Sequence, residues 1–134
     1  MSILVFDTSA IVEFLVGGDA LADKVRDHTR GRRLAAPHAV DLETASVLRG
    51  LVRGGKLPES EAERALDLLR RMQLRRYDHT ALLPRIWELR HNMWPYDASY
   101  AALAEALGAE LVTVDAKFSG VPHLRCQVTD LRLG

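Results

Sequence analysis

Residues 3–9 read ILVFDTS and indicate the fold class most directly. Its four apolar residues form a short continuous run rich in strand formers, which is typical of a strand buried on both faces of a parallel sheet. Asp7, Thr8 and Ser9 end the run, and all three are residue types that cap helix N-termini. We therefore predict a strand-to-helix turn at Asp7, with Ser9 as the cap and a short helix over 10–16.

A second stretch of the same kind, LVTVD, occupies residues 111–115. Weaker strand patterns lie at 32–36 and 74–77, and apolar residues at helical spacing fill the segments between the strands. The predicted helices cover residues 19–29, 38–53 with Pro37 in the first turn, 58–72, 80–92 and 97–107. This alternation indicates an α/β domain with a mostly parallel sheet, and we expect a single domain over residues 1–134.

The composition excludes some classes of site and partner. Acidic and basic residues balance at 18 each, so net charge favours neither nucleic acid nor a membrane surface. The single cysteine, Cys126, excludes an internal disulfide or a zinc cluster, and its setting indicates a late strand over 124–128. No stretch is long enough to span a bilayer, and the apolar start resembles neither a signal peptide nor an anchor. We expect a cytoplasmic protein with no membrane partner.

Two carboxylates follow the two buried-type strands. Asp7 comes directly after the first strand and Asp115 directly after the second. Open α/β sheets bind ligands at the carboxyl ends of their strands, so we expect both side chains at one edge of the sheet. Each residue alone is more typical of a turn or a helix cap. The matching context of the two favours a site.

Two further acids lie on predicted helices. Asp97 shares a helix face with Tyr100 and Ala101, a face that should be buried, although a simple helix cap would also explain this acid. Glu43 lies one turn from Val40 and Val47 on an apolar stripe, and no basic residue stands three or four positions away. An unpaired acid in that position needs a cation or a proton.

Four carboxylates in one place require a cation. At a spacing of about 5 Å they repel by roughly 3 kcal/mol per pair at an effective dielectric constant of 20. Ligands made only of oxygen select hard ions, so Mg²⁺ or Mn²⁺ fits the set, and the five histidines show no clustering that would favour zinc. Such ions activate water for cutting a phosphodiester bond. Thr113 and Ser9 are placed to hydrogen-bond these carboxylates, though Ser9 fits a helix cap better.

The order and spacing of four segments resemble a PIN-domain toxin of the VapC type. These segments are ILVFDTSA at 3–10, the helix with Glu43 after Pro37, DASYAALA at 97–104 and LVTVDAKF at 111–118. The resemblance implies a three-layer α/β/α fold, Mg²⁺-dependent cleavage of RNA, a homodimer and a small cognate antitoxin. The metal ligands of that family correspond to Asp7 and Asp97, with Glu43 and Asp115 completing the catalytic site and Thr113 supporting it.

Two other functions were considered. A phosphotransferase with Asp7 as nucleophile needs a second acid where this chain has Ser9. A non-catalytic, PIN-like partner-binding domain would use an apolar surface made by Trp87, Met93, Trp94 and Tyr96. We interpret these four side chains as core or dimer packing, and intact acids at all four places favour the enzyme.

Overall fold

The structure is a computed structural model that describes residues 2–133. Its strands form one sheet in the order β3-β2-β1-β4-β5, and every neighbouring pair is parallel. The predicted α/β class with a mostly parallel sheet is therefore confirmed. The predicted domain span of 1–134 also includes Met1 and Gly134, which lie outside the described residues.

The strands are short. They are β1 Ile3–Phe6, β2 Arg33–Pro37, β3 Leu74–Tyr77, β4 Glu110–Thr113 and β5 Val128–Asp130. The predictions for β1 and β3 are confirmed at both ends, whereas β4 begins and ends one residue earlier than expected. Because β1 and β4 pair with Phe6 opposite Val112, the two buried-type runs lie side by side at the centre of the sheet.

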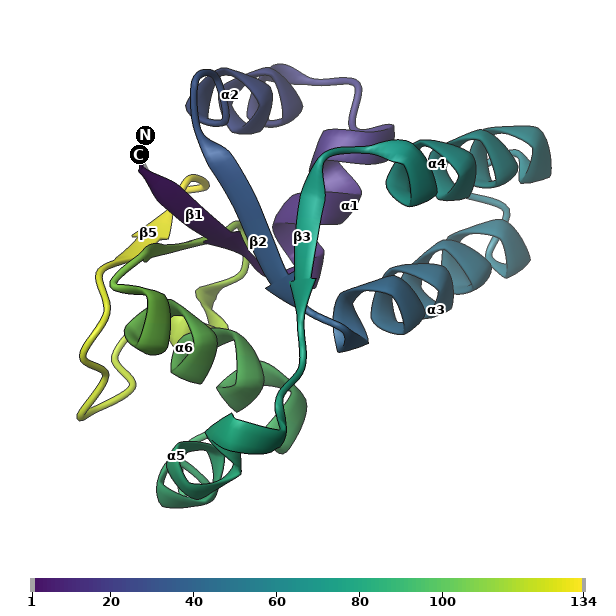
Figure 1. Cartoon of the computed structure of the whole chain (residues 1–134). Coiled ribbons are helices and arrows are strands. Elements are labelled where there is room, and N and C mark those ends of the chain that lie inside the picture. Colours follow the sequence, from purple (N-terminus) through teal and green to yellow (C-terminus); the bar gives the residue numbers. More distant parts are fainter. Residues whose placement is uncertain (1, 134) are drawn as a thin grey trace.

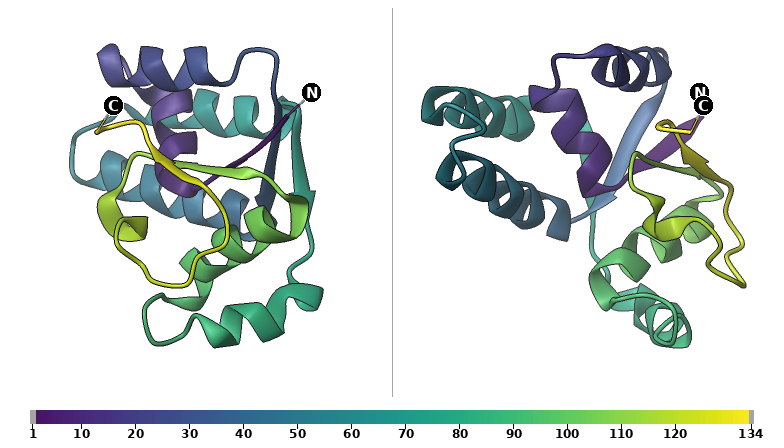
Figure 2. Two further views of the ribbon diagram at one scale, coloured as in Figure 1. Left: turned by 90° about the vertical axis from the view of Figure 1, so that its left-hand side faces the viewer. Right: turned by 180° about the vertical axis from the view of Figure 1, so that it is seen from behind.

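The helices form the two outer layers. They are α1 Thr8–Val16, α2 Ala20–His28, α3 Ala39–Arg53, α4 Glu59–Arg71, α5 Leu83–Glu88 and α6 Pro95–Leu107, with 3-10 turns η1 Thr80–Leu82 and η2 Ala116–Phe118. Helices α1 to α4 pack together, while α5 and α6 pack on the other side of the sheet (Figures 1 and 2). This is the predicted three-layer α/β/α arrangement.

The core lies between the sheet and these helices. Leu4, Val5 and Phe6 of β1 are fully buried, as are Leu111 and Val112 of β4. Burial of each such side chain contributes about 1.5–3 kcal/mol. Helix α6 presents mainly alanines to the sheet, and these small side chains let its backbone approach closely. The rigid centre of the domain is therefore the pair of strands that precede Asp7 and Asp115.

Three local predictions are wrong. Pro37 is the last residue of β2 instead of the first turn of α3, and there the strand ladder continues through the N–H of His38. The helix predicted over 80–92 is only η1 plus the short α5, which ends at Glu88. The Leu89 N–H is shared between the carbonyls of Arg85 and Ile86, both at 3.2 Å, and the next N–H, of Arg90, donates only three residues back to Trp87. Cys126 precedes β5, because ladder pairing with β4 begins only at Gln127.

No helix in residues 2–133 is both long and apolar enough to cross a membrane.

Candidate active site

The carboxyl ends of β1 and β4 meet where the strand order reverses. The chain passes from β1 outward to β2 and β3, and then returns to β4 on the other side of β1. Parallel sheets leave a crevice at such a point, and ligands bind there. The N–H of Asp7 donates to the Val112 carbonyl at 3.1 Å, so the chain leaves β1 directly beside β4. Asp7 and Asp115 therefore follow the two strands that flank this crevice.

The Asp7 carboxylate is fixed by three donors. It caps α1 by accepting a hydrogen bond from the Ala10 N–H at 3.1 Å, and the same oxygen accepts one from Ser9 Oγ at 2.7 Å. The other oxygen accepts a hydrogen bond from Thr113 Oγ1 at 2.9 Å. The helix cap predicted at Ser9 is therefore wrong. Because Asp7 takes the cap, Ser9 lies in the first turn of α1 and its hydroxyl points back to the carboxylate.

Burial dominates the electrostatics of Asp7. The side chain is 0% exposed, and this burial raises the pKa of its carboxyl group. The hydrogen bond from Ser9, the positive charge of Lys117 and the hydrogen bonds from Ala10 and Thr113 oppose the rise without cancelling it. A buried carboxylate in this state gains strongly from a nearby cation.

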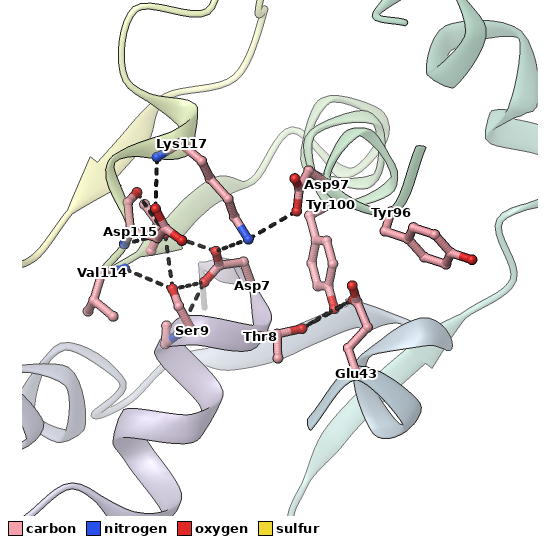
Figure 3. A network of polar contacts seen from close by, with 12 residues as sticks. Asp7, Thr8, Ser9, Glu43, Tyr96, Asp97, Tyr100, Val114, Asp115 and Lys117 are labelled. Atoms are coloured by element: carbon pink, nitrogen blue, oxygen red, sulfur yellow. Dashed lines mark hydrogen bonds and ion pairs between the residues drawn. The ribbon is translucent and has the colours of Figure 1, made fainter. Parts of the chain in front are cut away.

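Lys117 supplies that cation and joins Asp7 to Asp97. Its Nζ lies 3.0 Å from Asp97 Oδ1 and 3.6 Å from Asp7 Oδ2 (Figure 3). Asp97 is in the first turn of α6, where Trp94 holds the cap position, so the capping alternative for Asp97 is wrong. The face that Asp97 shares with Tyr100 and Ala101 is buried as predicted. Burial lowers the pKa of Lys117, but the charges of Asp7 and Asp97 outweigh it and raise the pKa overall.

Glu43 is bound by hydroxyl groups from two other helices. Its Oε1 accepts hydrogen bonds from Tyr100 Oη at 2.6 Å and from Thr8 Oγ1 at 3.2 Å (Figure 3). Burial, followed by the hydrogen bond to Glu43, raises the pKa of Tyr100, which keeps the phenol protonated as a donor. Glu43 has no basic residue beside it on its own helix, as predicted, and these hydroxyl partners come from α1 and α6.

Asp115 caps the short turn that carries Lys117. Its Oδ1 accepts a hydrogen bond from the Lys117 N–H at 3.0 Å, and its own N–H donates to Thr113 Oγ1 at 2.9 Å. Thr113 therefore connects the backbone of Asp115 to the carboxylate of Asp7. Asp115 also helps to set the position from which the Lys117 side chain extends toward the other acids.

The four predicted acids lie in one region of the structure, but their carboxylates do not converge on a single metal-binding position. A pocket of about 680 Å³ lies over the crevice. Among its lining residues are Thr8, Ser9, Glu43, Asp115, Lys117 and Arg132. Within residues 2–133, the His, Cys, Asp and Glu side chains form no group of three or more that is gathered closely enough to hold a metal ion. Asp7 and Asp97 meet through Lys117, whereas Glu43 is turned toward Tyr100.

A family model for the PIN domain matches residues 4–124 of this chain. The chain belongs to the PIN domain family. It is 40% identical to ribonuclease VapC9 of Mycobacterium tuberculosis over 94% of this chain and 96% of that protein. It is 37% identical to ribonuclease VapC1 of the same organism, over 96% of this chain and 97% of that one. These two relatives favour the enzyme over the non-catalytic domain.

Solved structures agree with this fold. Mycobacterium tuberculosis VapC20, described as a sarcin–ricin loop cleaving toxin, matches with a TM-score of 0.67 and 24% identity over 94% of this chain and 99% of that chain. The VapBC2 structure from Rickettsia felis, bound to a promoter DNA fragment, matches with a TM-score of 0.68 and 20% identity, over 94% of this chain and 98% of that one.

Sequence reasoning missed several residues of this site. Lys117 was visible as a lysine two positions after Asp115, but nothing local indicated that it reaches Asp97. Tyr100 was predicted on the buried face of its helix, but its hydrogen bond to Glu43 was not predicted. The two residues are 57 positions apart in the chain. Arg132 lines the pocket and donates to the Val114 carbonyl at 2.8 Å, from a segment that carries no motif.

Proposed function

We propose that this chain is the ribonuclease toxin of a toxin–antitoxin pair and hydrolyses RNA phosphodiester bonds at the acidic crevice. The observation that carries the proposal is the sharing of one cation by buried Asp7 and by Asp97, at the switch point of the sheet and beside an open pocket. The 40% identity to a curated ribonuclease over nearly the whole chain supports the same activity.

The donor set fits a hard divalent cation. Asp7 and Asp97 already hold a positive charge between them, in the form of the Lys117 ammonium. The four predicted acids offer only carboxylate oxygens, which suit Mg²⁺ or Mn²⁺. Asp7 and Asp97 would hold the ion, with Glu43 and Asp115 as the further predicted ligands. When bound, the ion polarises the phosphate and lowers the pKa of a bound water.

The residues around the acids have distinct tasks in this mechanism. Ser9 and Thr113 hold both oxygens of Asp7 in a fixed orientation, and such support strengthens the binding of an ion by a ligand. Glu43 and Asp115 line the open pocket, where one of them accepts the proton of the attacking water. Arg132 lines the same pocket and supplies positive charge toward the RNA phosphate.

We also propose two protein partners, a small cognate antitoxin and a second copy of this chain. Exposed apolar side chains flank the acids and need covering in a partner-bound state. Leu42, which precedes Glu43, is 79% exposed, and Trp94, which precedes Asp97 by three positions, is 78% exposed. Trp87 and Tyr96 are also exposed. Of the two packing roles predicted for these side chains, core packing is therefore wrong for Trp87, Trp94 and Tyr96 and holds for the buried Met93, and dimer packing is the role we propose for the exposed three. The active form is then a cytoplasmic homodimer of single PIN domains over residues 1–134.

Growth and RNA cleavage in cells test the toxin proposal. We would induce wild type, Asp97→Asn and the surface control Asp23→Asn, whose side chain is 78% exposed. Each would be induced alone and together with the small gene encoded beside it, which is the candidate gene for the antitoxin. Wild type and Asp23→Asn should arrest growth and produce new RNA 5′ ends, and the neighbouring gene should suppress both effects. Equal growth of cells that express wild type and Asp97→Asn would contradict the proposal.

A further inference from the structure

We propose that Lys117 is a displaceable internal cation, which holds the acidic crevice together without metal and must leave the acids before a divalent ion binds. This inference rests on the proposed metal site. In this role, Lys117 positions the two acids and lowers their affinity for the divalent ion.

The contacts of Lys117 place its ammonium where a metal would go. Nζ is 3.0 Å from Asp97 Oδ1 and 3.6 Å from Asp7 Oδ2. Divalent ions of this class need carboxylate oxygens at about 2.0–2.1 Å, so an ion held by both acids would occupy the space that Nζ fills. The ammonium and the ion therefore exclude each other.

The ion pairs of Lys117 explain why these acids are not gathered closely around one point. Lys117 satisfies Asp7 and Asp97 at hydrogen-bond and ion-pair distances, which are longer than metal–oxygen distances. No three acidic or other metal-binding side chains in residues 2–133 converge while this arrangement persists. Departure of the ammonium removes its attraction and leaves two carboxylates that repel each other until an ion binds.

Lys117 has space to move. Its side chain is 31% exposed, and it lines the 680 Å³ pocket that contains Glu43 and Asp115. It also lines a second pocket of about 530 Å³ formed by the α5–α6 connection, which includes Trp94 and Asp97. No other lining residue is common to these two pockets. A displaced ammonium therefore remains in the crevice, where it can meet an RNA phosphate.

Competition between the Lys117 ammonium and a divalent ion predicts the direction in which metal affinity changes when the ammonium is removed. Removal of the ammonium should raise the affinity for a divalent ion, because apparent affinity scales with the fraction of molecules whose binding site is free of the competing group. Lys117→Met keeps the length of the side chain and removes its charge. Lys117→Arg keeps the charge, and Lys56→Met removes a charge from an exposed residue of the α3–α4 turn.

The test is calorimetric titration of each metal-stripped protein with Mn²⁺, together with thermal melts in EDTA. Lys117→Met should bind Mn²⁺ about tenfold more tightly than wild type and melt at a lower temperature in EDTA. Lys117→Arg and Lys56→Met should bind no more tightly than wild type. Lys117→Gln provides a second neutral variant, with the same expected gain, if the methionine variant does not fold.

Equal or weaker Mn²⁺ binding by the folded neutral variant would overturn the inference and leave the proposed metal site intact. Failure of wild type and the neutral variant alike to bind Mn²⁺, with both folded by circular dichroism, would overturn the proposed site and the inference with it. The two failures are therefore distinguishable without any measurement of RNA cleavage.

Discussion

The hydroxyl of Tyr100 on α6 donates a 2.6 Å hydrogen bond to Glu43 on α3, across the mouth of the crevice. Tyr100 is 1% exposed, so removal of its hydroxyl leaves a carboxylate without its shortest partner. Tyr100→Phe should lower the free energy of unfolding by about 2 kcal/mol, as expected for a hydrogen bond to a charged group. Denaturant unfolding measures this loss.

A second tyrosine in the same helix provides the control for that substitution. Tyr96 is 64% exposed, and Tyr96→Phe should change the free energy of unfolding by less than about 0.5 kcal/mol. If the two variants unfold alike, the contact between Tyr100 and Glu43 contributes nothing to stability.

Asp7 makes the metal-free protein sensitive to pH. Burial raises the pKa of its carboxyl group above the value in the unfolded chain, so the wild type loses stability as pH rises through that raised pKa. Asp7→Asn carries no such charge. In EDTA at neutral pH the variant should therefore be more stable than wild type, by on the order of 1 kcal/mol.

Thermal melts over a series of pH values measure this difference. The advantage of Asp7→Asn should shrink as pH falls, because below the unfolded pKa the wild-type carboxyl is protonated in both states. If Asp7→Asn is less stable than wild type at neutral pH, the Asp7 carboxylate stabilises the fold and this prediction is wrong.

The ion pair between Arg85 and Glu105 should give the opposite dependence on pH. Arg85 donates to the two oxygens of Glu105 at 2.7 and 3.2 Å, and the Arg125 N–H donates to Glu105 at 2.7 Å. Burial raises the pKa of Glu105, but these partners outweigh it and lower the pKa overall. The stabilisation is therefore present above the unfolded pKa and is lost as pH falls through the lowered one.

Glu105→Gln should reduce the free energy of unfolding by about 2 kcal/mol at neutral pH, and by progressively less in acid. Glu88→Gln is the matched control, since Glu88 pairs with the same arginine while its side chain is 60% exposed. The control should lose less than about 1 kcal/mol. Equal losses from the two variants at every pH would contradict this account of Glu105.

The central strands were predictable from sequence because continuous apolar runs end sharply at polar residues. That is why β1 was placed without error and β4 within one residue. Pro37 was misplaced because proline is favoured in the first turn of a helix, whereas here it ends an interior strand. The short α5 was overextended because its apolar spacing continues past Glu88, where the regular helical hydrogen bonds give way to bonds between residues three apart, such as that of the Arg90 N–H to Trp87.

The candidate site was predictable only as far as local signals reach. Asp7 and Asp115 follow recognisable strands, and parallel pairing brings the ends of those strands together. The partners of Glu43 were not predictable, since Thr8 and Tyr100 reach it from other helices through tertiary packing. Lys117 was missed for the same reason, because its contact with Asp97 depends on where α6 begins relative to η2.

RNA cleavage by purified protein tests whether the acidic crevice is a metal-dependent ribonuclease site. Wild type and Asp97→Asn, purified side by side, would each be incubated with single-stranded RNA in Mn²⁺ or Mg²⁺, in EDTA, and in EDTA followed by excess Mn²⁺. We predict cleavage by wild type only with the divalent ion, recovery when Mn²⁺ is restored, and a rate at least about a hundredfold lower for Asp97→Asn. Undiminished cleavage by wild type after exhaustive removal of metal, or cleavage by Asp97→Asn at the wild-type rate, would contradict the account.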